Sequence, residues 1–137
     1  MFVLDASLTL AWAFDEEETE YTRAVLAQML EHVVVAPSVW PLEVTNAAVT
    51  AARRRRIDDS EVRALIELVR GLDVEVDGQA HRVAFDDVAT LAQEHALTSY
   101  DAAYLELALR MNAPLATVDA GLARAARAAG VELLLRD

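Results

Sequence analysis

Cysteine and lysine are both missing from this chain of 137 residues. Without cysteine, the chain has no disulfide framework, no thiolate zinc site and no cysteine nucleophile. The lack of lysine excludes mechanisms that depend on that side chain, among them those of P-loop kinases and of phosphoacceptor receiver domains. All strong positive charge therefore belongs to twelve arginines.

From the sequence we also expect no linker and no targeting segment. No stretch rich in proline, glycine or serine divides the chain, which has only 3 prolines and 4 glycines. The first residues include no basic leader, and Asp5 interrupts their apolar run too early for a signal peptide or a spanning helix. Hydrophobic residues make up 55% of the sequence, enough for a real core. We predict a single domain over residues 1–137, cytoplasmic and without membrane contact.

The charge balance is strongly acidic. Twelve arginines against 23 aspartates and glutamates give a formal net charge of −11. Such a charge repels polyanions, so any binding of nucleic acid would need local cations or metal ions.

Short β-branched or apolar runs alternate with helical patterns along the chain. This alternation predicts an α/β fold, a single three-layer domain with a mainly parallel sheet of four or five strands flanked by helices. The predicted strands are 2–4, 33–35, 74–76, 115–118 and 131–135. The predicted helices are 7–14, 19–31, 38–55, 60–72, 80–95, 99–111 and 120–129.

Two of the predicted strands end in aspartate, at Asp5 and Asp119. In an open parallel sheet, ligands bind beyond the carboxyl ends of the strands, at the point where strand order reverses. Each aspartate also precedes a helix, so each is equally suited to cap that helix through a backbone N–H. Finding both together favours a ligand site.

Two further acids fall on helices that are predicted to be buried. Glu43 lies within an inward stripe that includes Trp40 and Ala47, which should partly desolvate its carboxylate. A buried carboxylate needs a cation or hydrogen-bond donors nearby, and the alternatives to a ligand role are an arginine partner or a boundary position. Asp101 begins a very apolar helix, where Thr98 and Asp101 also fit a capping box.

Together these four acids would make a site of oxygen ligands alone, which selects Mg²⁺, with Mn²⁺ as a substitute, over zinc or copper. The three histidines have no spacing typical of a metal site. We expect them at the surface or at boundary positions.

The ordered motifs of this chain resemble those of the PIN-domain ribonucleases, and within them the VapC-type toxins of toxin–antitoxin pairs. The resemblance spans essentially the whole chain. It is carried by four segments, which are VLDAS at 3–7, PLEVTN at 41–46, SYDAAYLELA at 99–108 and LATVDAGL at 115–122.

This resemblance implies a PIN-like fold and an endoribonuclease in which the four acids hold a divalent metal. It assigns Ser7 and Thr117 as hydroxyls that orient ligands or water. The predicted reaction is hydrolysis of an RNA phosphodiester by a metal-activated water. The resemblance also implies a homodimer and a cognate antitoxin whose tail occupies the acidic groove. A catalytically idle module that binds RNA or regulates through its antitoxin is the alternative.

Four consecutive arginines, Arg53, Arg54, Arg55 and Arg56, end the helix that carries Glu43. Arginine forks suit phosphate oxygens, so this run is a candidate RNA contact. Cations also favour the carboxyl ends of helices, and the acids at 58, 59 and 61 are available as partners. The interpretation as solvated charge is slightly favoured.

Overall fold

The computed structural model describes the backbone of residues 1–137 and every side chain except that of Asp15. Four strands form its sheet, namely β1 (Phe2–Leu4), β2 (Val34–Pro37), β3 (Glu75–Asp77) and β4 (Leu115–Ala116). Between them run α1 (Ala6–Ala13), η1 (Asp15–Glu17), α2 (Glu20–Gln28), α3 (Trp40–Arg53), α4 (Asp59–Arg70), α5 (Ala80–Val83), η2 (Ala84–Val88), α6 (Ala89–His95), α7 (Ser99–Met111) and α8 (Ala120–Ala128).

The sheet is parallel throughout, and its strand order is β3-β2-β1-β4. Val3 pairs with Val35 on one side and with Leu115 on the other. The chain thus moves outward from β1 through β2 to β3, and later returns to the opposite side of β1. The reversal of strand order lies between β1 and β4, so the two strands followed by Asp5 and Asp119 are neighbours, as predicted.

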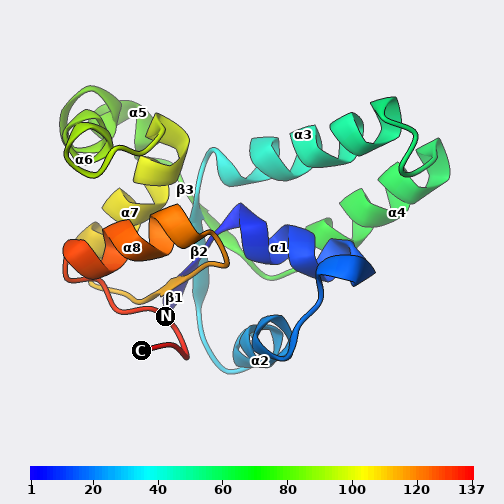
Figure 1. Cartoon of the computed structure of the whole chain (residues 1–137), viewed down its shortest axis with the longest axis horizontal. Helices are drawn as coiled ribbons and strands as arrows, with labels where there is room; N and C mark the ends of the chain where they lie inside the picture. The colour runs from blue at the N-terminus through cyan, green and yellow to red at the C-terminus, as the bar shows by residue number, and fades with distance from the viewer.

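Helices cover both faces of this sheet, which confirms the predicted three-layer α/β fold (Figure 1). On one face α7 packs against β1 and β2, with α6 and α8 beside it. On the other side α1 packs against α2, α3 and α4, and the α3–α4 hairpin projects outward (Figure 1). Every residue of β1 and β2 is buried, because strands covered on both faces have no solvent side. No helix in the described part of the chain is long and apolar enough to cross a membrane.

Side-chain caps fix the starts of α2, α4, α7 and α8, whereas α1 and α3 begin without one. Thr98 accepts a hydrogen bond from the backbone N–H of Asp101 at 3.1 Å, and this bond fixes the start of α7. Capping boxes begin α2 at Thr19 and α4 at Asp58. These local bonds satisfy donors that the first helical turn leaves unpaired.

Apart from shifts of one or two residues at the ends of elements, three predicted elements differ from the structure. The helix predicted over 19–31 ends at Gln28. The helix predicted over 80–95 is interrupted by a π-helical segment, η2, whose Phe85 is 93% exposed, so its apolar pattern does not mark one continuous buried face. The strand predicted over 131–135 pairs at one point only, Leu133 with Leu115. Its residues form a tail along the edge of β4 instead of a fifth strand.

One arginine ties the exposed edge of the sheet to α7. Arg110 donates hydrogen bonds to both carboxylate oxygens of Asp77 at 3.0 and 2.8 Å. It also bonds both oxygens of Glu106, at 2.7 and 3.0 Å. Because the Glu106 and Asp77 side chains are only 6% and 10% exposed, Arg110 neutralises two carboxylates that water reaches poorly.

We predict that Arg110→Met lowers the free energy of unfolding by about 2–4 kcal/mol at pH 7, because two largely buried carboxylates lose their cation. Arg110 lowers the pKa of Asp77, so this stabilisation is present above the unfolded-state pKa and is lost as the pH falls through the lower folded-state pKa. Urea unfolding at pH 7 and pH 3 measures both effects. Arg70→Met, which removes an exposed pair with Glu67, should cost less than about 0.5 kcal/mol. Equal losses for the two variants would contradict this assignment.

Candidate active site

Asp5 lies at the carboxyl end of β1 and is 4% exposed. Its Oδ2 accepts hydrogen bonds from the hydroxyls of Ser7 at 2.5 Å and Thr117 at 2.7 Å. Although Asp5 precedes α1, its side chain makes no capping bond to that helix. The capping alternative for Asp5 is therefore wrong, and among the described residues its Oδ1 has no hydrogen-bond donor.

Asp119 lies just after β4, the strand next to β1, and its side chain caps α8. Its Oδ1 accepts from the backbone N–H of Leu122 at 2.7 Å, so here the capping interpretation is confirmed. The hydroxyl of Thr117 accepts from the Asp119 backbone N–H at 3.0 Å while it donates to Asp5. Thr117 thus links the ends of β4 and β1 through a single oxygen atom.

Glu43 lies in the first turn of α3, and its carboxylate is half-buried beside the core. Its Oε1 accepts a hydrogen bond of 2.9 Å from the hydroxyl of Tyr104, a fully buried residue of α7. The predicted inward stripe is confirmed for Trp40, Val44 and Ala48, which are buried, whereas Ala47, like Glu43, is only partly buried. No arginine pairs with Glu43 in the described structure, so the ion-pair alternative does not apply.

The four carboxylates influence one another. Burial raises the pKa of Asp5, and the charges of Asp101 and Asp119 raise it further. Burial raises the pKa of Glu43 as well, with added repulsion from Asp5 and Asp101. The pKa of Asp101 is raised by burial and by Asp119, against a lowering effect of the Thr98 hydroxyl. The fold therefore brings the four predicted acids into one electrostatic cluster.

No cation of the described chain neutralises this cluster, because none of its ion pairs involves any of the four acids. Asp5, Glu43 and Asp119 each have one oxygen anchored by a protein donor, which leaves their second oxygen available. Such a set of hard oxygen donors fits Mg²⁺ or Mn²⁺. As they stand, however, no three such side chains of the described structure form a chelating group.

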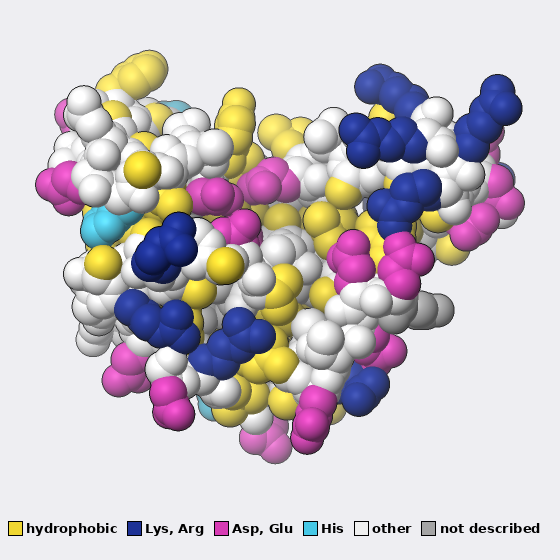
Figure 2. All heavy atoms as spheres, in the orientation of Figure 1, with side chains coloured by type: hydrophobic (Ala, Val, Ile, Leu, Met, Phe, Trp, Pro, Cys, Tyr) yellow, Lys and Arg dark blue, Asp and Glu magenta, His cyan; other side chains and the backbone are white. Residues whose placement is uncertain are grey.

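Arginines flank the acids on this face of the molecule. Acidic side chains gather at its centre, and arginine side chains lie over the far end of α3 and over α8 (Figure 2). A groove of about 310 Å³ runs from Glu43 past Asn46 and Thr50 to Arg54, along one side of α3. This groove connects the cluster with the arginine run that the sequence singled out.

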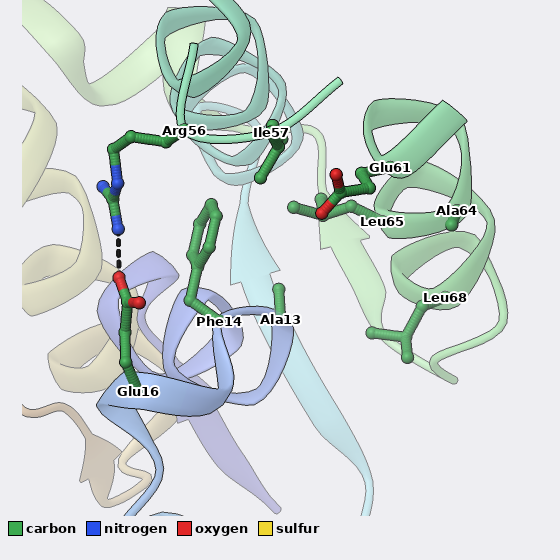
Figure 3. Close-up of a pocket in the computed structure, with 9 residues that line it drawn as sticks. All are labelled: Ala13, Phe14, Glu16, Arg56, Ile57, Glu61, Ala64, Leu65 and Leu68. Atoms are coloured by element: carbon green, nitrogen blue, oxygen red, sulfur yellow. Dashed lines mark hydrogen bonds and ion pairs between the residues drawn. The ribbon is translucent and has the colours of Figure 1, made fainter. Parts of the chain in front are cut away.

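Within that run, Arg56 differs from the other three. It pairs with Glu16 and lies over the ring of Phe14, 5.3 Å from its centroid, at the edge of a pocket between α1 and α4 (Figure 3). The pairing predicted with the acids at 58, 59 and 61 is not present in the described structure. Arg53, Arg54 and Arg55 are exposed and make no ion pair there.

Arg55 has a left-handed backbone, with φ of 57°. Its N–H bonds the carbonyl of Ala52 and the N–H of Arg56 bonds that of Ala51, which is the pattern of a Schellman motif. Glycine is the usual residue at this position because it has no Cβ to clash. An arginine there costs about 1 kcal/mol of backbone strain.

Sequence reasoning missed Tyr104, the one donor to Glu43. It follows Asp101 by three residues and therefore shares a helix face with it. That spacing could have indicated its position near the site. Within an apolar helix, however, a tyrosine is most simply interpreted as a core residue.

Comparison with known proteins gives a consistent result. A family model described as PIN domain matches residues 2–128. The chain is 29% identical over 121 residues to Ribonuclease VapC3 of Pyrobaculum aerophilum, covering 88% of this chain and 91% of that protein. Its fold is similar to the crystal structure of FitAcB from Neisseria gonorrhoeae, with a TM-score of 0.68, 15% identity and coverage of 98% of this chain and 96% of that chain.

We predict that, without metal, the stability of Asp5→Asn relative to the wild type increases as the pH rises from about 4 to 7. The raised pKa of Asp5 means that ionising it costs more in the folded than in the unfolded state, whereas asparagine does not ionise. Thermal unfolding in chelator across this pH range measures the difference. Asp86→Asn, which changes an exposed acid that shifts none of these pKa values, should show no such trend. A parallel pH profile for wild type and Asp5→Asn would contradict the prediction.

Proposed function

The chain belongs to the PIN domain family, and on that premise we propose that it is a metal-dependent endoribonuclease, the toxin of a type II toxin–antitoxin system. The observation that carries the proposal is a cluster of four carboxylates without an internal cation, at the edge where β1 and β4 end. Its similarity to a protein named as a ribonuclease supports RNA as the substrate. The family's motifs in this sequence support the toxin assignment.

Asp5, Glu43, Asp101 and Asp119 would hold the divalent ion. A bound Mg²⁺ or Mn²⁺ lowers the pKa of a water molecule and neutralises charge on the phosphate. Asp5 would offer Oδ1, since Ser7 and Thr117 already hold its Oδ2. The two hydroxyls keep that carboxylate in one orientation, so the side chain loses little further freedom when it binds an ion. No side-chain nucleophile is required.

The exposed arginines of α3 would bind the RNA backbone. Acidic walls repel phosphate, so binding needs cations outside the cluster. Arg54 lies at the end of the groove that begins at Glu43, and Arg53 and Arg55 lie beside it in sequence. The strained backbone of Arg55 supports a functional role, because glycine would suit the turn better.

A cognate antitoxin and a second copy of the chain complete the proposal. The family's motifs in this sequence support an antitoxin whose tail lies in the acidic groove. Exposed apolar side chains, with Leu42 70% and Phe85 93% exposed, support a homodimer.

We predict that the wild-type protein cleaves single-stranded RNA with Mg²⁺ or Mn²⁺ and that chelator abolishes the cleavage. Asp5→Asn should lower the rate at least about 100-fold, because asparagine keeps the hydrogen bonds of Ser7 and Thr117 but loses the charge that holds the ion. Gel analysis of a defined RNA and its end groups measures this, with Asp86→Asn as the control at wild-type rate. Full activity of Asp5→Asn, or cleavage in chelator, would refute the site. RNA binding without any cleavage would favour the idle module.

We predict that Arg55→Gly weakens RNA binding while it stabilises the protein. The substitution relieves the left-handed strain, for a gain of about 0.5–1 kcal/mol, and it removes a phosphate contact. Filter binding of RNA by the Asp5→Asn variant, with and without Arg55→Gly at low salt, measures the affinity, and urea unfolding measures the stability. The matched control is Arg63→Gly, in the interior of α4 and away from the groove, which should lose stability and keep RNA affinity. Unchanged affinity in Arg55→Gly would show that this arginine is only solvated charge.

A further inference from the structure

Tyr104 is a buried polar group that the proposed chemistry does not use. Its side chain is fully buried, yet its hydroxyl donates to Glu43 Oε1 at 2.9 Å. Glu43 is 61 residues away in the sequence, so this bond links two separate helices.

This hydroxyl joins two of the segments that carry the acids. Glu43 belongs to α3, and Tyr104 lies one turn after Asp101 on α7. Burial raises the pKa of Tyr104, and the charges of Asp5 and Glu43 raise it further. A simple core residue at this point would need no hydroxyl, because phenylalanine fills the same space without burying a polar atom.

We propose that Tyr104 is a positioning residue for the metal site, which fixes Glu43 so that one carboxylate oxygen is held and the other is free to bind the ion. This inference rests on the proposed function and adds a residue to it. The bond to Glu43 matches those of Ser7 and Thr117 to Asp5, since in both cases hydroxyls hold a single oxygen. In this role the hydroxyl would bond only Glu43 and would not touch the ion or the substrate, so Tyr104 would act through Glu43.

Hydrogen-bonded partners of metal ligands typically contribute about 10–100-fold in metal affinity. We therefore expect Tyr104→Phe to weaken Mn²⁺ binding at least about 10-fold. Because the ring remains, the core stays filled and the fold is retained. In a Glu43→Gln background the same substitution should change Mn²⁺ affinity by less than about 2-fold, since the carboxylate that Tyr104 orients is gone.

The test is calorimetric titration of the metal-free, full-length protein with Mn²⁺, without RNA, for the wild type, Asp5→Asn, Tyr104→Phe and Tyr21→Phe. Tyr21 is the matched control, because its hydroxyl donates at 3.0 Å to the carbonyl of Leu134 and not to a carboxylate. Tyr21→Phe should keep wild-type affinity. The RNase rate of Tyr104→Phe should also recover as Mg²⁺ is raised, which a misfolded variant would not do.

The outcomes separate this inference from the proposed function. If the wild type binds no Mn²⁺, the proposed metal site itself is wrong and the role of Tyr104 falls with it. If the wild type binds Mn²⁺, Asp5→Asn does not, and Tyr104→Phe binds as the wild type does, the positioning role alone is refuted. Equal losses in Tyr104→Phe and Tyr21→Phe would also refute it, because a general loss of structure would explain both.

Discussion

The burial of the Asp5 carboxylate without a cation is the constraint on which the site depends. Two hydroxyls, from Ser7 and Thr117, hold this carboxylate where water hardly reaches it. The charges of Asp101 and Asp119 raise its pKa, and its own charge raises the pKa of Glu43. Hydroxyls orient a carboxylate but leave its charge in place, so the cluster remains electrostatically costly. Elsewhere in the chain, Arg110 forms ion pairs with the poorly exposed carboxylates of Glu106 and Asp77. The contrast indicates that the acidic cluster is kept for an external cation.

The parallel sheet explains how residues so distant in sequence meet. Because β1 and β4 are adjacent and point the same way, Asp5 and Asp119 end at one edge of the sheet. The same edge receives the first turns of α3 and α7, which bring Glu43 and Asp101. Thr117 and Tyr104 then link these elements through hydroxyl groups. The site is therefore a product of topology, with short polar bonds that set the orientation of each carboxylate.

Much of this could be predicted from the sequence. Strands 2–4 and 115–118 were recognisable as buried apolar runs that lead into aspartate, and the acids on helices stood out against apolar neighbours. The sequence could not decide between cap and ligand, because both roles need an acid at a helix start. In the structure, Asp119 caps α8 through one oxygen and keeps the other available, whereas Asp5 caps nothing. Predictions failed at 80–95 and 131–135, where apolar residues lie at exposed or edge positions, and at Tyr104, whose partner is 61 residues away.

Crystals of the protein grown with Mn²⁺, measured for anomalous scattering, would test the central claim most directly. We expect one or two anomalous peaks within about 2.0–2.3 Å of carboxylate oxygens of Asp5 and of at least two among Glu43, Asp101 and Asp119. Tyr104 should still be bonded to the remaining oxygen of Glu43. No peak at saturating Mn²⁺, with the four carboxylates pointing apart or paired with arginines, would contradict the account.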